Sequence, residues 1–221
     1  MPRSLRAVIE VILPVLDEAE AIPHVLAAMP PGFVPLVVDN GSRDGSAGVA
    51  SRHGARVVRE PRCGFGAACF AGLQAARSDV VCFMDCDGSL DPGQLPLVAG
   101  PVICGEADLC VGARNPEPGA WPWHARAGNR VLALELRRRF GFGLTDLGPM
   151  RSAGREALLA LDLRDRGLGW PLEMVIKAGV AGWTVAEVGV SYRVRAGGRS
   201  KVSGSARGTL RALRDMAALI A

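Results

Sequence analysis

The chain has 221 residues, 49% of them hydrophobic, and a formal net charge of +4, which suffices for one α/β domain and argues against disorder. Six cysteines lie in the first half without a Cys-x-x-Cys pair, and three histidines are scattered, which excludes a disulfide scaffold or a zinc site. The sequence has neither a run of about 18 apolar residues nor a signal-peptide core at its start, so we expect a soluble cytoplasmic protein.

The first half of the chain alternates strand and helix patterns. We expect strands at residues 7–13, 34–38, 56–59 and 80–84, and helices at 20–29, 46–53 and 66–76. Strands that alternate with helices predict an α/β fold with a mostly parallel sheet and right-handed crossovers.

The second half is less regular. We expect strands at 107–112 and 184–190, helices at 126–140, 155–161 and 173–178, and loops rich in glycine and proline at 115–122 and 196–204. Residues 210–220 form either an ordinary closing helix or an interfacial helix on a membrane surface.

Charge is divided unevenly between the two halves. Residues 1–110 carry 8 basic and 13 acidic side chains, a net charge of −5, whereas residues 111–221 carry 18 and 9, a net charge of +9. This division predicts an acidic, metal-binding half and a basic half that meets an anion, either phosphate or a membrane surface. Aromatic residues are only 5% of the chain, so a nucleic-acid partner is not expected.

The most informative stretch is VVCFMDCD at residues 80–87, an apolar run that ends in Asp85 and Asp87. A buried strand that ends in paired carboxylates sets two negative charges at the edge of a sheet, where they repel each other unless a cation lies between them. Mg²⁺ or Mn²⁺ takes such oxygen ligands and often shares them with substrate phosphates. The alternative is a pair of solvated loop charges, because Asp-x-Asp also occurs by chance.

Other expected strands also end in polar residues, namely Asp17 and Glu18 after the first strand and Asp39 after the second. Ligands of open α/β sheets bind beyond the carboxyl ends of the strands, so these side chains are candidates for binding a base, a ribose or a diphosphate. In the alternative interpretation, residues 39–42 are only a turn and a cap for the next helix.

Taken in order, several motifs resemble the family-2 glycosyltransferases of GT-A fold. They are ILPVLDE at 12–18, VVDNGSRDGS at 37–46, GFGAA at 64–68 and DCD at 85–87. Four later motifs are similar to those of the polyprenyl (dolichyl) phosphate mannose synthase branch. They are TDLGPMR at 145–151, GWPLEM at 169–174, EVGV at 187–190 and YRVRAGGRSK at 192–201.

The resemblance implies a single GT-A (Rossmann-like) domain over residues 1–221, with a nucleotide-binding half at 1–110 and an acceptor-binding half at 111–221. It implies that nucleotide-binding residues are Pro14, Asp17, Glu18, Asp39, Gly64 and Asp85. It implies that Asp85 and Asp87 hold Mg²⁺ or Mn²⁺. It implies that the acceptor or the diphosphate meets Arg114, Arg126, Arg130, Arg193, Arg195, Arg199 and Lys201.

The implied activity is inverting transfer of a sugar from GDP-mannose or a UDP-sugar to a polyprenyl phosphate, with peripheral membrane contact at the inner face as a further expectation. Asp146 and Glu173 are the candidate catalytic residues, but a general base is essential only for a hydroxyl acceptor, since a phosphate acceptor is already an anion. Alternatively, Asp146 pairs with Arg151 and Glu173 with Lys177, as structural contacts.

Departures from the family pattern leave the acceptor open. Asn40 stands where many relatives carry a second aspartate, and Gly88-Ser89 follows the paired aspartates where mannose synthases tend to have Leu-Gln. A soluble hydroxyl acceptor therefore stays as an alternative.

Three other classes of protein share some of these features. Gly64-Phe65-Gly66 and the later Asp85 resemble part of a dinucleotide-binding fingerprint, but Cys69 takes the third glycine position. A sugar nucleotidyltransferase needs a basic glycine-rich loop after the first strand, where residues 14–18 stand instead. A non-catalytic nucleotide-sugar binder stays open, because a fold does not imply a function.

Overall fold

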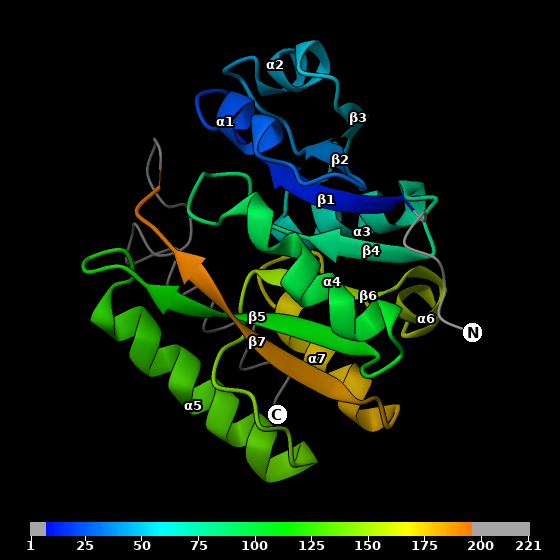
Figure 1. Cartoon of the computed structure of the whole chain (residues 1–221), viewed down its shortest axis with the longest axis vertical. Coiled ribbons are helices and arrows are strands. Elements are labelled where there is room, and N and C mark those ends of the chain that lie inside the picture. The colour runs from blue at the N-terminus through cyan, green and yellow to red at the C-terminus, as the bar shows by residue number, and fades with distance from the viewer. Residues whose placement is uncertain (1–7, 196–221) are drawn as a thin grey trace.

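A seven-stranded sheet with helices on both faces forms the centre of the molecule (Figure 1). The computed structural model describes residues 8–195. The strands are β1 (Ile9–Val15), β2 (Phe33–Asp39), β3 (Arg56–Arg59), β4 (Val80–Phe83), β5 (Leu109–Pro116), β6 (Met150–Gly154) and β7 (Val185–Tyr192). Their order in the sheet is β3-β2-β1-β4-β6-β5-β7. Only β6 is antiparallel to its neighbours, so the expected α/β fold with a mostly parallel sheet is confirmed.

Seven α-helices and one short 3-10 helix lie in the described part of the chain. They are α1 (Ile22–Ala27), α2 (Ser46–Arg52), α3 (Phe65–Ala75), η1 (Pro92–Gln94), α4 (Leu95–Ile103), α5 (Trp123–Phe140), α6 (Arg155–Ala160) and α7 (Trp170–Val180). Helices α1, α2 and α4 bury apolar side chains against one face of the sheet, and α3, α5, α6 and α7 contribute to the core on the other face. Each face of the sheet therefore has its own hydrophobic core.

The elements expected within residues 8–195 are all present, with ends that differ by a few residues, but α4 and β6 were not expected. Helix α4 has Pro96 in its first turn and Pro101 inside it, and proline usually argues against a helix. Strand β6 is only five residues long and contains Arg151, Ser152 and Gly154, so no alternating apolar pattern marks it.

The topology brings widely separated segments to one edge of the sheet. Because all strands except β6 are parallel, the carboxyl ends of β1, β2, β4, β5 and β7 lie together with the amino end of β6. We call this the carboxyl edge, and in Figure 1 the arrows of β1, β5 and β7 point toward it at the left. Any residue that directly follows a parallel strand, or directly precedes β6, is therefore a candidate for one common site.

Within residues 8–195, no helix is both long and apolar enough to cross a bilayer. Three sequence-based expectations, namely Arg199, Lys201 and the helix at 210–220, lie outside the described residues.

Helix α3 lies directly on the sheet because Gly72 carries no side chain. A Cβ atom at this position would come within 2.4 Å of Cγ2 of Ile12 and 3.0 Å of Cγ2 of Val38. Both of these neighbours are fully buried in the core, so they have little room to move away.

We expect Gly72→Ala to lower the free energy of unfolding by about 1–3 kcal/mol, because the added methyl group overpacks a filled core. Denaturant unfolding measures the effect. Gly128→Ala in α5 is the matched control, since nothing lies within 4 Å of its added Cβ and alanine favours a helix by about 1 kcal/mol. Equal effects of the two variants would contradict this account of the packing.

Candidate functional site

Acidic side chains from three strands meet at the carboxyl edge. Asp17 and Glu18 follow β1, Asp39 ends β2, and Asp85 and Asp87 follow β4. Pairing of β1 with both β2 and β4 places these three strand ends side by side. The expectation that these acidic residues gather at one edge of a parallel sheet is therefore confirmed.

The loop after β4 holds its two carboxylates differently. Oδ1 of Asp87 accepts hydrogen bonds from the backbone N–H of Ser89 at 2.9 Å and from the Ser89 hydroxyl at 2.5 Å. Asp85 accepts no hydrogen bond from any residue in the range 8–195. Burial, followed by the negative charge of Asp87, raises the pKa of Asp85 to about 7, although Arg114 and Arg195 act in the opposite direction. The structure thus fixes Asp87 and leaves the Asp85 carboxylate without a fixed donor.

Arg195, which follows β7, links the two acidic segments. Its Nη2 lies 2.6 Å from Oε1 of Glu18, and its Nε lies 3.4 Å from Oδ2 of Asp87. The side chains of all three residues are at most 20% exposed, so solvent screens the contacts only weakly. The structure thus places Arg195 beside the acidic segments, and its expected binding of the acceptor or the diphosphate stays a prediction.

Arg114 and Asp146 form a buried two-pronged ion pair at the ends of β5 and β6. Nε and Nη2 of Arg114 lie 2.8 and 2.6 Å from the two carboxylate oxygens of Asp146, which also accepts the backbone N–H of Arg114 at 2.8 Å. The Arg114 guanidinium stacks on the ring of Trp121, 3.7 Å from its centroid. Asp146 therefore holds Arg114 in one orientation beside the acidic loop.

The suggested pairing of Asp146 with Arg151 is wrong. The guanidinium of Arg151 is fully buried and donates to three carbonyl oxygens, those of Leu147 at 2.5 Å, Gly148 at 3.0 Å and Pro171 at 2.5 Å. Burial lowers the pKa of Arg151 to about 10. This side chain joins the loop before β6 to the start of α7.

Glu173 is buried at the start of α7, and its carboxylate binds a neighbouring loop. It accepts the backbone N–H groups of Arg164 and Asp165 at 2.7–2.9 Å, and Lys177 lies 3.0 Å from Oε1. The structural alternative that pairs Glu173 with Lys177 is confirmed. Both carboxylate oxygens of Glu173 thus already accept hydrogen bonds from the backbone.

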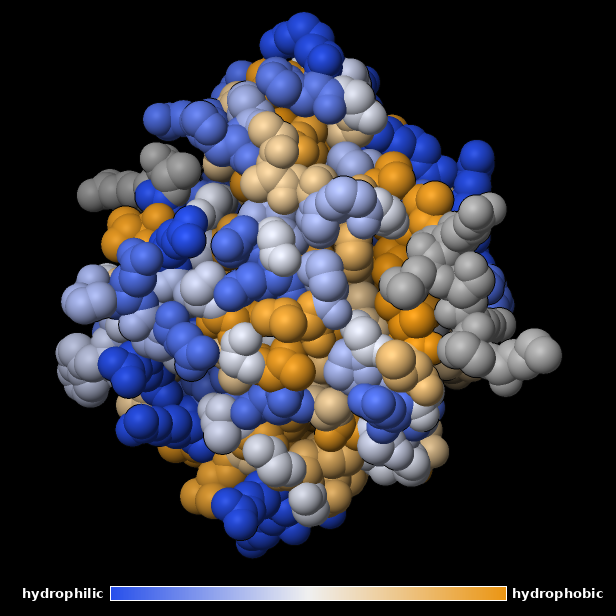
Figure 2. Space-filling view, in the orientation of Figure 1, coloured by the Kyte–Doolittle hydropathy of each residue, from blue (hydrophilic) through white to orange (hydrophobic). Residues whose placement is uncertain are grey.

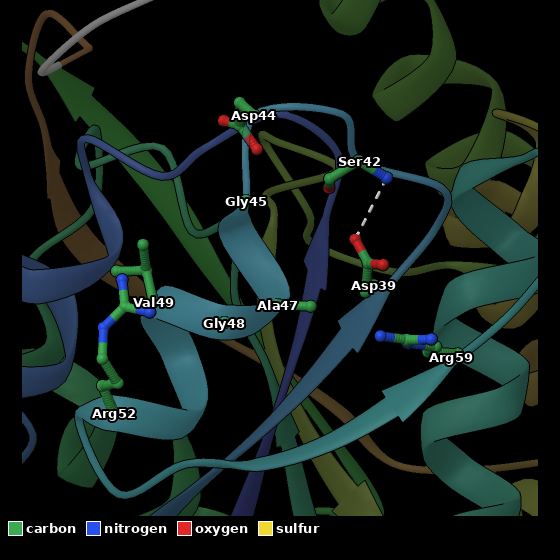
Figure 3. A pocket seen from close by; sticks show the side chains of 9 residues that line it. All are labelled: Asp39, Ser42, Asp44, Gly45, Ala47, Gly48, Val49, Arg52 and Arg59. Atoms are coloured by element: carbon green, nitrogen blue, oxygen red, sulfur yellow. Dashed lines mark hydrogen bonds between the residues drawn. The ribbon is translucent and has the colours of Figure 1, made fainter.

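An open pocket of about 550 Å³ lies beside Asp39, between the ends of β2 and β3 and the start of α2 (Figure 3). Asp39 and Arg59 pair across the neighbouring strands, and both line this pocket. One oxygen of Asp39 accepts the backbone N–H of Ser42 at 3.1 Å. Arg59 was not among the expected site residues, although the rule that selects Asp39 applies to it as well, since Arg59 also ends a parallel strand at the carboxyl edge.

Asn40 fixes the loop that leads to α3. Its side-chain nitrogen donates to the carbonyl oxygens of Glu60 and Arg62 at 2.9 and 2.8 Å, and its oxygen accepts the backbone N–H of Gly64 at 2.8 Å. Gly64 has a φ of +149°, and a Cβ there would come within 2.0 Å of the Arg166 carbonyl oxygen. A carboxamide suits position 40 because it offers two N–H donors and an acceptor at once, whereas a carboxylate only accepts. Glycine suits position 64 because any Cβ there would clash with the backbone of Arg166.

The remaining expected site residues are less closely connected. Pro14 lies in β1 beside Val38 of β2. The side chain of Arg193 is 55% exposed, and its ion contacts within residues 8–195 are long, 3.6 Å to Glu117 and 3.9 Å to Asp91. Its backbone N–H donates to the carbonyl oxygen of Ser89, in the loop after β4, at 2.8 Å. Arg126 and Arg130 are exposed on α5, and no contact joins them to the acidic loop.

Known proteins match this fold and this sequence. The model of the family described as glycosyl transferase family 2 matches residues 10–160. A protein of Mycobacterium tuberculosis named as an uncharacterized glycosyltransferase is 50% identical over 208 residues, which are 94% of this chain and 95% of the relative. The undecaprenyl-phosphate mannosyltransferase of Micrococcus luteus is 32% identical over 213 residues, which cover 87% of this chain and 86% of the relative.

Among solved structures, glucosyl-3-phosphoglycerate synthase of M. tuberculosis in complex with Mn²⁺, UDP-glucose and phosphoglyceric acid has a TM-score of 0.76 and 25% identity. The match covers 97% of this chain and 80% of that enzyme. The fold is thus that of a GT-A glycosyltransferase. The chain belongs to glycosyl transferase family 2 and resembles its polyprenyl phosphate mannose synthase branch, which leaves the oxidoreductase and nucleotidyltransferase alternatives without support.

We expect Asn40→Asp to lower the free energy of unfolding by at least about 1–3 kcal/mol, because a carboxylate would face two carbonyl oxygens to which the amide now donates. Thermal or denaturant unfolding at neutral pH measures this. Asn115→Asp is the control, since Asn115 is exposed, and we expect it to change stability by no more than about 0.5 kcal/mol. An Asn40→Asp variant as stable as the parent would contradict the proposed role of the amide.

The raised pKa of Asp85 predicts a pH-dependent stability for the metal-free protein. Its value of about 7 in the folded state lies above the ordinary 3.8, so the folded protein binds the extra proton, and the contribution of Asp85 to stability falls as the pH rises between these values. Without metal, we expect Asp85→Asn to be more stable than the parent at about pH 8, with a smaller difference at about pH 5. Unfolding in EDTA at both pH values tests this, and a difference independent of pH would contradict it.

Proposed function

We propose that the chain transfers a sugar, with inversion, from a nucleoside diphosphate sugar to a polyprenyl phosphate at the cytoplasmic face of a membrane. The observation that carries the proposal is the charge arrangement at the carboxyl edge. There, Glu18, Asp85 and Asp87 meet Arg114 and Arg195 from the other half of the sheet. A site that combines carboxylates for a metal with fixed arginines for phosphate suits a diphosphate.

The paired aspartates fit a divalent metal. No group of three or more acidic, histidine or cysteine side chains in the described part of the chain forms a complete metal cage, and Mg²⁺ typically uses one or two protein carboxylates plus substrate phosphates. Asp85 is buried, accepts no hydrogen bond from the described residues and lies near the negative charge of Asp87, and both its burial and that charge raise its pKa. The related glucosyl-3-phosphoglycerate synthase was crystallised with Mn²⁺ and with Mg²⁺. When bound, the metal would neutralise charge on the leaving diphosphate.

We assign the nucleoside to the pocket beside Asp39. A carboxylate at the end of β2 can accept hydrogen bonds from a base or a ribose, and Arg59 beside it offers donors. Asp17 lies close to this pocket through its bond to the backbone N–H of Arg43, at 2.7 Å. The proposal therefore places the base near β2 and the diphosphate near β4, with the sugar directed toward β5 and β6.

Two arginines act on the leaving group. Negative charge builds up on the diphosphate as the glycosidic bond breaks, and fixed cations next to it lower the barrier. Arg195 enters from β7 and Arg114 from β5, and the latter is held in place by Asp146 and Trp121. In this scheme, Asp146 is a positioning residue that acts through Arg114.

Asp146 and Glu173, the two candidate general bases, are already held by hydrogen bonds and ion pairs, and this supports a phosphate acceptor. Asp146 is engaged by Arg114, and Glu173 by two backbone N–H groups and Lys177. A phosphate monoester attacks as an anion and needs little general base, whereas a hydroxyl must lose a proton. The 32% identity to the undecaprenyl-phosphate mannosyltransferase of M. luteus is a second, independent support.

A second candidate is transfer to a soluble hydroxyl acceptor. The observation that favours it is the match to glucosyl-3-phosphoglycerate synthase, whose complexes contain UDP-glucose and phosphoglyceric acid. Polyprenyl phosphate and phosphoglyceric acid both carry a phosphate, so Arg114 and its neighbours suit either of these two acceptors.

A radiochemical assay distinguishes these candidates. We expect labelled sugar from GDP-mannose or a UDP-sugar to appear on polyprenyl phosphate in the presence of Mg²⁺ or Mn²⁺ and to be lost with EDTA. Transfer only to phosphoglyceric acid would establish the second candidate. Nucleotide binding without transfer to either acceptor would favour a non-catalytic binder.

We expect Asp87→Ala to lower the affinity for GDP or UDP in the presence of Mn²⁺ by at least about tenfold, or about 1.4 kcal/mol, because it removes a proposed metal ligand. Isothermal titration calorimetry with Mn²⁺ and then with EDTA measures it. Asp91→Asn is the control on the same loop, since its side-chain oxygen can still accept the N–H of Gly93. The metal assignment fails if Asp87→Ala binds nucleotide as tightly as the parent does.

A further inference from the structure

The outer face of α5 carries an exposed apolar stripe. Trp123, Val131 and Leu134 are 79%, 67% and 67% exposed, and at about 100° per residue their directions fall within about 80° of one another. The opposite face of the helix is buried, through Asn129, Ala133 and Leu136. Within residues 8–195 no side chains cover the stripe, although its residues are of the kind that normally packs inside.

A row of arginines runs along one side of this stripe. Arg126, Arg130 and Arg137 are exposed and form no ion pair with the described residues. Glu135 and Arg139 lie on the other side, and Arg138 falls within the angular range of the stripe at its carboxyl-terminal end. Glu135 binds both of these arginines, so their charges are partly balanced. In Figure 2, hydrophilic side chains cover the lower left of the molecule, where α5 lies in the same orientation in Figure 1.

The amino end of α5 lies beside the candidate site. The backbone N–H of Glu117, just after β5, donates to the carbonyl oxygen of Tyr192 at the end of β7. Trp121 then stacks on Arg114, and α5 begins two residues later. The exposed stripe therefore starts next to the proposed leaving-group arginines and runs away from them.

We propose that the outer face of α5 docks onto an anionic lipid surface. An exposed tryptophan with aliphatic neighbours enters the boundary between head groups and acyl chains, and uncompensated arginines at the side of the helix bind lipid phosphates. The charge of the row complements anionic lipids, whereas a second copy of this face would bring the same arginines together. This inference deepens the proposed function, because it places the mouth of the site at the surface where a polyprenyl phosphate lies.

Vesicle sedimentation of the full chain without nucleotide tests the proposal. We expect binding to vesicles that contain phosphatidylglycerol and much weaker binding to pure phosphatidylcholine. Each arginine contributes about fivefold near such a surface, so Arg126→Gln/Arg130→Gln should weaken binding by tens of fold. Val131→Ser/Leu134→Ser should also weaken it, and both positions are exposed, so the variant should fold.

Arg77→Gln/Arg164→Gln is the charge-matched control, since both arginines are exposed away from α5, and it should bind as the parent does. Trp123→Phe should remove most of the blue shift in tryptophan fluorescence on vesicle binding. Absence of vesicle binding, or equal binding by all variants, would overturn the proposal. So would a dimer that Val131→Ser/Leu134→Ser dissociates, because a second copy would then cover this face.

Calorimetric titration of nucleotide into the parent chain keeps the two proposals separate. A parent chain that binds nucleotide but no anionic vesicles overturns only the docking surface. A parent chain that binds vesicles but no nucleotide overturns only the proposed transfer reaction.

Discussion

Arginines from one half of the sheet compensate the carboxylates that the other half gathers at the carboxyl edge. Parallel strands β1, β2 and β4 bring several carboxylates together, and such groups destabilise a folded chain unless cations lie nearby. Arg195 reaches Glu18 and Asp87 from the end of β7, and Arg114 faces the same loop from β5. Arginines of the basic second half thus compensate carboxylates of the acidic first half at one shared edge of the sheet.

The α/β fold was predictable because its signals are local. Apolar runs such as 80–84 mark buried strands, and their alternation with helices predicts the parallel sheet. The strand order was not predictable, because β6 is short and polar and its pairing with β4 depends on residues that lie far apart in the sequence. Helix α4 was not predicted because it contains two prolines, although one of them occupies a first-turn position where proline is favourable.

For the candidate site, the positions of residues were easier to predict than their roles. Strand ends placed Asp39, Asp85 and Asp87 correctly at one edge, because the rule requires only the direction of the strands. Roles depend on partners, and partners depend on tertiary structure. The partner of Asp146 is Arg114, 32 residues away, and Glu173 binds the backbone of a loop, a contact that no spacing rule reveals.

The reversed direction of β6 has a consequence for how this enzyme class diversifies. The segment between β5 and β6, which contains α5, both leaves from and returns to the carboxyl edge. The segment therefore begins and ends at the same edge of the sheet, and a change in its length or surface need not shift the strands that carry the acidic residues. This part of the chain can thus vary while the edge that carries Asp39, Asp85 and Asp87 keeps its geometry.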